Sequence, residues 1–420
     1  MSVLAWRPYQ RALALPGAPG FVSAGFIARL PMSMVPLGIV LAVSGITGTY
    51  ALAGALSATY ALSAAIGSPL TSRIVDRRGQ HRVLPALAGL HAAALVALVV
   101  SLVAAWPIVV QFACAASAGA LVPAIGAFVR ARWAAKVHQQ GPPAPAGAAL
   151  DDQPDVRVTL STAFAIESIL DEVAYTIGPL LAASLAAAAG APIPLVVATG
   201  LGLAGALLLA GQRRSEPAPR PAIRHPAGSP DRQRLLRTPG MPTVLATLFG
   251  IGIVFGAYEV AVVAFCSEAG APAATGIVLG IWAVGSMIAG IWFGGRHWQA
   301  PIARQLTITT GLVALTVVPA LLVPNVLLLT VSTMIAGAAF APSLICLFAL
   351  TEQAVPSARL TEGLAWSQSA IMVGFALGAA LGGAGVDAWG PSLAFGIPLA
   401  AGIGTWALWL RPAPVWKPVR

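Results

Sequence analysis

Residues 67–84 read GSPLTSRIVDRRGQHRVL and interrupt a long apolar stretch with a short, strongly charged segment. This segment carries one carboxylate, Asp76, one central glycine, Gly79, and the arginines 73, 77, 78 and 82. Glycine permits a tight turn of the backbone. The apolar runs on either side, residues 49–70 and 84–105, each reach the roughly 20 residues that a helix needs to cross a bilayer. We therefore interpret residues 67–84 as a loop between two membrane-spanning helices.

The composition of the whole chain supports this interpretation. Of the 420 residues, 58% are hydrophobic and 9% are charged, and the mean hydropathy is +0.84. Soluble domains carry about 25% charged residues. This composition excludes a soluble enzyme, a disordered protein and a nucleic-acid-binding module. The apolar runs are continuous, which favours helices over the short alternating strands of a membrane barrel.

The same reading extends along the chain to twelve apolar segments and predicts an all-α membrane protein. The expected spans are 20–43, 49–70, 84–105, 108–129, 159–181, 192–211, 240–263, 273–294, 302–320, 325–348, 362–384 and 391–410. We expect the first span to be an uncleaved segment, because no removable signal peptide precedes it.

The distribution of basic residues predicts the orientation. If both termini are cytoplasmic, every Lys and Arg except Arg29 lies on the cytoplasmic side, and Arg29 lies within the first span. We therefore expect a multi-pass protein of the bacterial inner (cytoplasmic) membrane, a monomer, with the lipid bilayer and not nucleic acid as its surroundings.

The longest arginine-rich segment divides the chain. Residues 212–238 carry seven arginines against Glu216 and Asp231, and we expect them to form a cytoplasmic linker between two six-helix bundles, residues 1–211 and 239–420. A shift of 200 residues places Gly178 over Gly378, which is consistent with duplicated halves around a site near the midplane.

The loop at 67–84 resembles the signature between the second and third helices of the major facilitator superfamily. Asp76, Arg77, Gly79 and Arg82 match that signature, whereas Ser72 replaces its leading glycine and Gln80–His81 replace its usual basic pair. The resemblance implies the twelve-helix facilitator fold, with two pseudo-symmetric bundles that rock around a central cavity.

A second, shorter element lies in the fifth span. Gly178–Pro179 is similar to the Gly-Pro element in the fifth helix of facilitator antiporters, which implies a bend or a close helix contact and proton-coupled export. One departure counts against a multidrug exporter. Those antiporters usually carry an arginine within the fourth span, whereas this expected span holds Gln111 and ends before Arg130.

Four charged residues lie well within the first and fifth predicted spans. Arg29 lies in the first span, and Glu167, Asp171 and Glu172 lie in the fifth, at a shared depth of roughly 12–20 Å. In the related fold these helices are neighbours, so the resemblance implies an ion-pair cluster. Because charges within a bilayer are costly, the cluster is either a proton-coupling site or a permanent network that joins the helices. We favour coupling, since three acids would face one base.

Other side chains are candidates for a substrate site or for movement between the bundles. On spans that line the cavity in the related fold, the candidate substrate-binding residues are Met34, Tyr60, Tyr258, Glu259, Trp366 and Gln368. Packing explains the aromatic and methionine side chains equally well, and Glu259 is alternatively a solvated helix end. Gly374 and Gly378 belong to a small-residue stripe that we expect at the rocking interface with the second span, although static packing is the alternative.

Together these patterns predict a secondary transporter for a small organic solute, with proton-coupled export as the leading hypothesis. Proton symport, facilitated uptake, a non-transporting membrane receptor or scaffold, and a lipid flippase are the alternatives. We expect no enzymatic activity and no cofactor, because the sequence contains no recognisable enzymatic site. The chain contains no P-loop motif, which counts against ATP-driven transport. The three cysteines and five histidines are dispersed and predict neither a disulfide nor a metal site.

Overall fold

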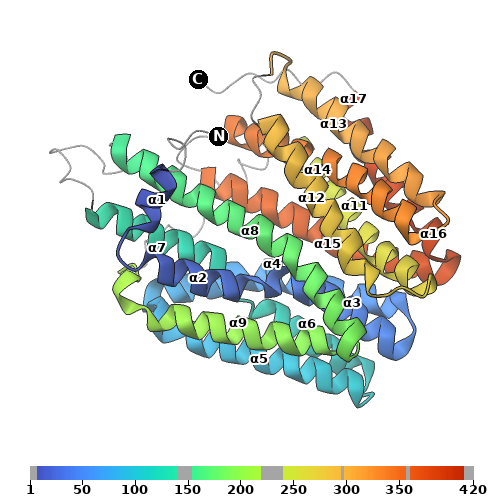
Figure 1. Cartoon of the computed structure of the whole chain (residues 1–420), viewed down its shortest axis with the longest axis horizontal. Helices are drawn as coiled ribbons and strands as arrows, with labels where there is room; N and C mark the ends of the chain where they lie inside the picture. Colours follow the sequence, from blue (N-terminus) through green and yellow to red (C-terminus); the bar gives the residue numbers. More distant parts are fainter. Residues whose placement is uncertain (1–6, 141–153, 219–239, 295–297, 356–359, 411–420) are drawn as a thin grey trace.

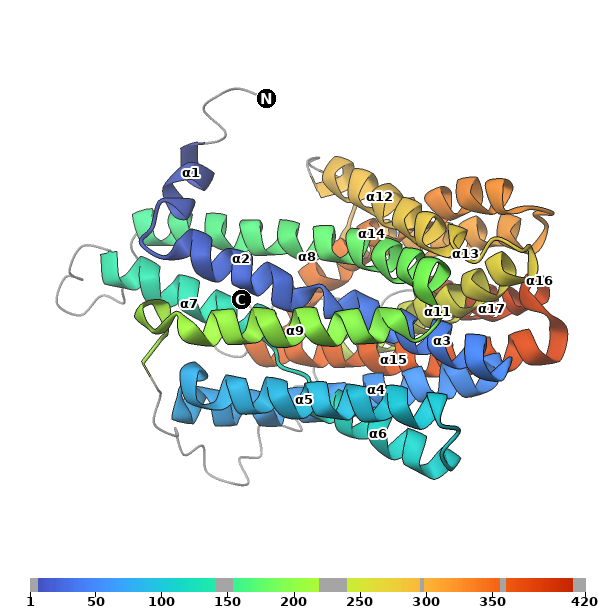
Figure 2. The same cartoon turned by 60° about the horizontal axis from the view of Figure 1, so that its bottom comes forward.

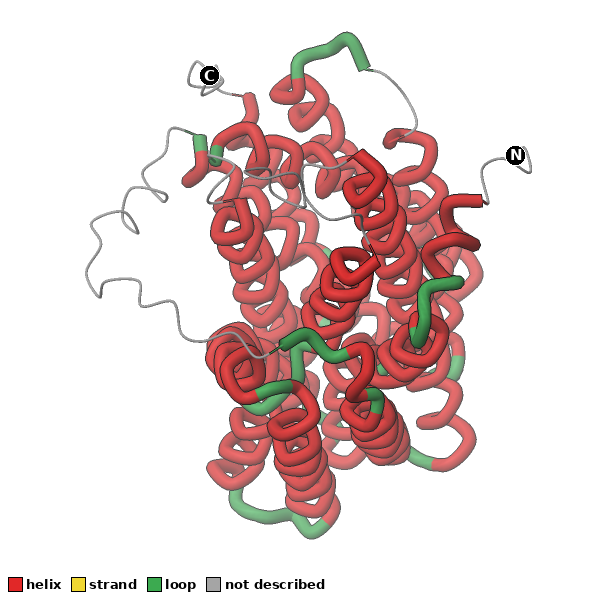
Figure 3. The backbone as a smooth tube through the Cα atoms, turned by 90° about the vertical axis from the view of Figure 1, so that its left-hand side faces the viewer, coloured by secondary structure: helices red, strands yellow, loops and turns green. Residues whose placement is uncertain are grey.

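The computed structural model describes residues 7–140, 154–218, 240–294, 298–355 and 360–410. In this part of the chain the regular structure is entirely helical, as Figure 3 shows. Twelve helical segments are long and apolar enough to cross a membrane, which confirms the predicted count.

The first six spans pack largely against one another and form the lower, blue-to-green part of Figure 1. A short helix, α1 (Arg7–Leu13), precedes them. The spans are built from α2 (Ala18–Arg29), α3 (Pro31–Thr47), α4 (Tyr50–Arg78), α5 (Gln80–Val103), α6 (Ile108–Ala120), α7 (Ile125–Gln140), α8 (Pro154–Ala189) and α9 (Ile193–Gly211), and the 3-10 helix η3 (Arg213–Ser215) follows. We call this unit the first bundle.

The remaining six spans form the second bundle, in yellow to red. It consists of α11 (Met241–Glu268), α12 (Ala274–Gly294), α13 (Ile302–Val317), the 3-10 helix η4 (Val318–Leu321), α14 (Val326–Ala354), α15 (Leu360–Trp389), α16 (Pro391–Ala394) and α17 (Gly396–Leu410). Helix α15 packs against α4 at the boundary between the two bundles, as can be followed in Figure 2.

Two spans of the first bundle are interrupted. The first span bends at Leu30, where Pro31 begins α3, and the fourth span breaks between α6 and α7 at residues 121–124, which include Pro123. Proline lacks the N–H that would continue the helical hydrogen bonds. The fourth span resumes after the break and extends to Val137. Arg130 therefore lies within this span, whereas the sequence had suggested that Arg130 follows it.

The two ends of the molecule differ. We call the end that carries the turn at Gly79 and the 3-10 helix η3 the basic end, and the opposite end, with the turns at Gly48, Gly270 and Gly390, the far end. Figure 1 shows the helices of the two bundles converging toward the far end and spreading apart toward the basic end.

Contacts at the far end explain this convergence. A Cβ added to Gly54 of α4 would overlap the carbonyl of Ala379 in α15, so these two helices touch through their backbones. Gly276 of α12 packs in the same close manner against Leu180 of α8. Small residues allow such close helix packing within a membrane. Both contacts lie in the half of each helix that points to the far end.

Gly374 and Gly378 of the eleventh span do not form this interface. Gly374 packs against the backbone of Phe249, and Gly378 packs against the backbone of Ile253, both in α11 of the same bundle. The expected rocking contact with the second span is therefore wrong for these two glycines. The spacing of the stripe indicates a smooth helix face, but it does not indicate which neighbouring helix covers that face.

Candidate functional site

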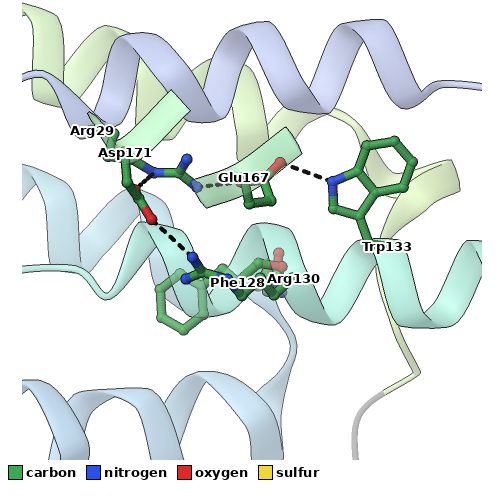
Figure 4. A network of polar contacts seen from close by, with 7 residues as sticks. Arg29, Phe128, Arg130, Trp133, Glu167 and Asp171 are labelled. Atoms are coloured by element: carbon green, nitrogen blue, oxygen red, sulfur yellow. Dashed lines mark hydrogen bonds and ion pairs between the residues drawn. The ribbon is translucent and has the colours of Figure 1, made fainter. Parts of the chain in front are cut away.

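The charged cluster begins at the bend of the first span. Arg29 is the last residue of α2, and its side chain is 1% exposed. Figure 4 shows its guanidinium pointing at two acids of α8. Nη2 donates to Oε2 of Glu167 at 2.5 Å, and Nε lies 3.1 Å from Oδ1 of Asp171, close enough for an ion pair but not aligned as a hydrogen bond.

The fourth span contributes two further side chains to the cluster. Arg130 Nη2 donates to Oδ2 of Asp171 at 2.8 Å, and the indole N–H of Trp133 donates to Oε1 of Glu167 at 2.8 Å. Both residues lie on α7, which starts directly after the break at 121–124. We call the five residues Arg29, Arg130, Trp133, Glu167 and Asp171 the ionic network.

The charge balance of the ionic network differs from the expectation. Two arginines oppose two carboxylates, so the network is neutral as drawn, whereas the sequence suggested three acids facing one base. Glu172 does not join it, because one helical residue turns the side chain by about 100° away from Asp171. The structure thus brings Arg29, Glu167 and Asp171 together and leaves Glu172 outside.

Sequence reasoning missed Arg130 and Trp133 because the expected fourth span ended at residue 129. A signal was present: Arg130 and Trp133 are three residues apart and share one helix face, and Pro123 precedes them at the depth where a helix would be interrupted. A longer fourth span would have placed both beside the acids of the fifth.

The candidate substrate residues occupy different environments. Met34, Tyr60 and Tyr258 belong to the apolar core, and the Tyr258 hydroxyl lies 2.8 Å from the Thr333 hydroxyl. Trp366 is half-buried beside Met241 and Val355, and Gln368 is exposed. Packing therefore accounts for most of this set.

Glu259 is the exception among these candidates. Its side chain is 8% exposed, so it is not the solvated helix end that the sequence left open. Its Oε1 atom is enclosed and has no hydrogen-bond partner among the described residues.

The Gly-Pro element of α8 makes the close contacts that were expected of it. A Cβ on Gly178 would overlap the hydroxyl of Ser33 in α3, and that hydroxyl donates to the carbonyl of Ala174 at 2.9 Å. On the other side, the carbonyl of Pro179 faces Gly276 of the second bundle. The helix continues through Pro179, so the element brings three spans together without breaking α8.

The loop signature holds the start of the linker. Gly79 has φ +93°, a left-handed conformation that favours glycine, while Asp76, Arg77 and Arg82 are exposed. The carboxylate of Glu216 accepts from the backbone N–H of His81 at 3.2 Å and lies 2.8 Å from His81 Nδ1.

A second contact to the linker comes from α7. Arg132 is fully buried and donates to the carbonyl of Gln212 at 2.8 Å and to the hydroxyl of Ser215 at 2.7 Å. Its Nε also donates to Oε1 of Gln80 at 2.7 Å. Residues 212–216 are therefore fixed to the first bundle at the basic end. The sequence did not predict this anchor, because the partners are distant along the chain.

A small cavity of about 30 Å³ adjoins the ionic network, with Arg29, Tyr60, His91 and Pro123 among the residues that line it. His91 Nδ1 lies 2.8 Å from the carbonyl of Ala118, close to the helix break. In the described part of the chain, no three His, Cys, Asp or Glu side chains are grouped so as to hold a metal ion.

Known structures share this fold. A mutant of the nucleoside transporter NupG has a TM-score of 0.70 at 13% identity, over 93% of this chain and 98% of that chain. An auto-inhibited POT family peptide transporter has a TM-score of 0.69 at 9% identity, over 96% and 98%. The POT family transporter PepTSo has a TM-score of 0.66 at 10% identity, over 94% and 97%. At these identities the likeness shows the fold alone.

No curated protein matches the chain in sequence. The family model described as Major Facilitator Superfamily matches residues 21–302, from the first span to the start of the ninth. The match includes the loop signature, the ionic network and the linker anchor. On this evidence the chain belongs to the major facilitator superfamily.

Proposed function

We propose that the chain is a monomeric secondary transporter that exports a small organic solute across the cytoplasmic membrane, coupled to proton entry and working by alternating access. The family and the transporter neighbours support a transport role and not an enzymatic one. The buried ionic network is the observation that carries the coupling.

Alternating access is supported by the unequal ends of the molecule. The bundles touch through Gly54 and Gly276 toward the far end, while their helices spread at the basic end. Basic loops favour the cytoplasm, so we assign the basic end and both termini to the cytoplasmic side. On this assignment the structure is inward-facing, and the far-end contacts separate when the protein opens outward.

The domain boundaries form part of the same proposal. We assign residues 1–211 and 239–420 to the two moving bundles and residues 212–238 to their linker. The anchoring of Gln212 and Ser215 by Arg132 supports a linker that begins directly after α9.

The ionic network supports proton coupling because protonation of one of its acids changes the ion pairs of its arginines. Protonation of Asp171 would release Arg130, whose guanidinium would then seek another acceptor. Arg29 would keep Glu167, which also accepts from Trp133, so the two acids have different roles. We assign Asp171, whose side chain is 25% exposed, as the proton acceptor, and the fully buried Glu167 as the residue that positions Arg29.

The test uses the full chain in proteoliposomes with an imposed pH gradient. Efflux of a panel of neutral, anionic and cationic solutes is measured together with proton entry, reported by an internal pH-sensitive dye. We expect gradient-driven flux of at least one solute, and loss of that coupling in Asp171→Asn.

The matched control is Glu268→Gln, which removes an exposed carboxylate at the far end of α11. If Asp171→Asn and Glu167→Gln both keep wild-type coupled flux, the coupling role is wrong. If no solute moves in the wild type, transport itself is contradicted, and the receptor or scaffold alternative is favoured.

A further inference from the structure

A buried carboxylate faces the seam between the bundles without a partner. Glu259 lies on α11, its side chain is 8% exposed, and its Oε1 atom accepts no hydrogen bond from the described residues. A carboxylate in this position costs free energy unless a proton or a cation accompanies it. The basic side chains of this region do not supply the cation, because Arg29 and Arg130 are already paired with Glu167 and Asp171.

A second carboxylate reaches the same seam from the first bundle. The phenol of Tyr175 on α8 lies within electrostatic reach of Asp171, Glu259 and Glu172, so acids of both bundles lie around this tyrosine. Glu172 is partly buried and forms no ion pair with any described residue. Glu172 and Glu259 are therefore two carboxylates near Tyr175, one from each bundle, that form no ion pair with a described residue.

Aromatic rings lie beside Glu259. Phe255 precedes it by one helical turn on the same face. The Phe255 ring lies 4.6 Å from the Trp282 ring and 5.4 Å from the Phe375 ring, and the Trp282 ring lies 5.4 Å from the Phe340 ring. Ring faces attract organic cations, most strongly when water is excluded.

One of these rings also carries an unused polar atom. The indole N–H of Trp282 is enclosed, its side chain is 6% exposed, and it donates to no described residue. Buried indole N–H groups usually find an acceptor. Trp282 and Glu259 are thus two independent polar groups of the second bundle. Each is more than nine-tenths buried, and each has a polar atom with no hydrogen-bond partner among the described residues.

Tyr175 lies beside a contact between the bundles. Gly280 of α12 approaches the carbonyl of Thr176 in α8, at 3.8 Å from the position of a Cβ atom. Tyr175 precedes Thr176, so the acids around its phenol lie near this contact. Any movement between the bundles changes the space around these acids.

We propose that Glu259, assisted by Glu172 and the aromatic group of Phe255, Trp282, Phe340 and Phe375, binds the positive centre of an organic cation with an apolar body. The proposal rests on the proposed transport function and names the substrate class of the same passage. The carboxylate neutralises the charge, the rings contact the apolar body, and the Trp282 N–H takes a hydrogen-bond acceptor of the ligand where it has one.

The experiment measures binding of three cations of increasing size, tetramethylammonium, tetraethylammonium and tetraphenylphosphonium, to the purified full chain in detergent. We expect at least one to bind, reported by a change in tryptophan fluorescence that is absent from Trp282→Phe. Glu259→Gln removes the charge and keeps the shape, and it should weaken binding roughly thirtyfold or more, as the loss of a buried charge partner does. Glu268→Gln, on the same helix but exposed, should bind as the wild type does.

A measurement on the wild-type chain covers the case in which the variant does not fold. Carbodiimide modification of Glu259, followed by mass spectrometry, should be slowed by the bound cation and unaffected by a neutral solute of similar size. Failure of all three cations to bind, or equal binding by Glu259→Gln, overturns the proposal, as does carbodiimide labelling that no cation slows; a proton is then the only partner of Glu259.

The two proposals fail in different ways. Gradient-driven flux of a neutral or anionic solute, with no cation bound, leaves the transport function standing and overturns the substrate class. Cation binding that depends on Glu259, with no flux of any solute in proteoliposomes, supports the site and contradicts transport.

Discussion

The carboxylate of Asp387, near the end of α15, accepts the backbone N–H of Tyr50, the first residue of α4, at 2.9 Å. Its second oxygen accepts the N–H of Ala51 at 2.7 Å. The first N–H groups of a helix have no partner within that helix, and a carboxylate at this end also interacts favourably with the helix dipole. An acid of the second bundle thus caps a helix of the first, and this cap must break when the far end opens.

Asp387→Ala should favour the open far end. The loss of these charge-assisted hydrogen bonds at a solvent-exposed position costs about 1–2 kcal/mol, which shifts the two populations roughly five- to thirtyfold. Spin labels at Ile46→Cys and Leu393→Cys, both exposed positions at this end, should report longer distances. Glu268→Ala, an exposed acid nearby, is the control, and an unchanged distance distribution in Asp387→Ala would contradict the capping role.

Gly54→Ala should prevent the far end from closing fully. The added Cβ overlaps the carbonyl of Ala379, and a backbone atom cannot move aside as the end of a side chain can. The same spin-label pair should show a longer distance, and transport should fall. Gly89→Ala adds the same atom to a helix position with open space around it, so its distances should match the wild type. Equal closure in both variants would show that α4 and α15 do not need this contact.

Arg130→Gln and Asp171→Asn should be coupled in stability. Asp171→Asn leaves Arg130 without its acid, and Arg130→Gln leaves Asp171 with Arg29 alone; each change should lower the free energy of unfolding by about 1–3 kcal/mol. The double variant removes both charges and should lose less than the sum of the singles. Thermal unfolding of the four proteins gives the coupling, and Arg82→Gln, an exposed arginine, is the control. Additive losses would mean that the 2.8 Å contact contributes nothing to the fold.

Gly79→Ala should loosen the linker anchor. The residue has φ +93°, which costs an L side chain about 1–2 kcal/mol, and its Cβ would lie 2.9 Å from Oε1 of Glu216. We expect a lower unfolding temperature than for Gly211→Ala, where neither strain nor a close neighbour is present. Adding Glu216→Gln to Gly79→Ala should leave the backbone strain at position 79 unchanged. The second change should lower stability little further, because Gly79→Ala already disrupts the contact between Glu216 and His81. Equal unfolding temperatures for the two glycine variants would refute the anchor.

The twelve spans could be predicted because hydropathy is a local property of the sequence. The pairing of Arg29 with the acids of α8 was also accessible, since depth along two neighbouring helices follows from residue counting. The break at 121–124 was not, because the sequence shows where a proline stands but not whether the helix resumes beyond it. Arg130 and Trp133 lie in that second half of the span and were therefore not predicted.

The partners of the helix faces were the least predictable feature. Gly374 and Gly378 mark a smooth face, yet only the packed structure shows that α11 covers it. No sequence pattern predicts the role of Asp387, since its partners are backbone N–H groups more than 330 residues away along the chain. Such contacts depend on how the bundles dock, which no local pattern specifies.

His81 and Arg132 hold residues 212–216, so the first bundle anchors the start of the linker through noncovalent contacts. The attachment of residues 212–216 to the first bundle consequently does not depend on an unbroken peptide between the two bundles. Two separate polypeptides divided after residue 218 should reassemble in the membrane when expressed together, and a division before residue 212 should fail to do so.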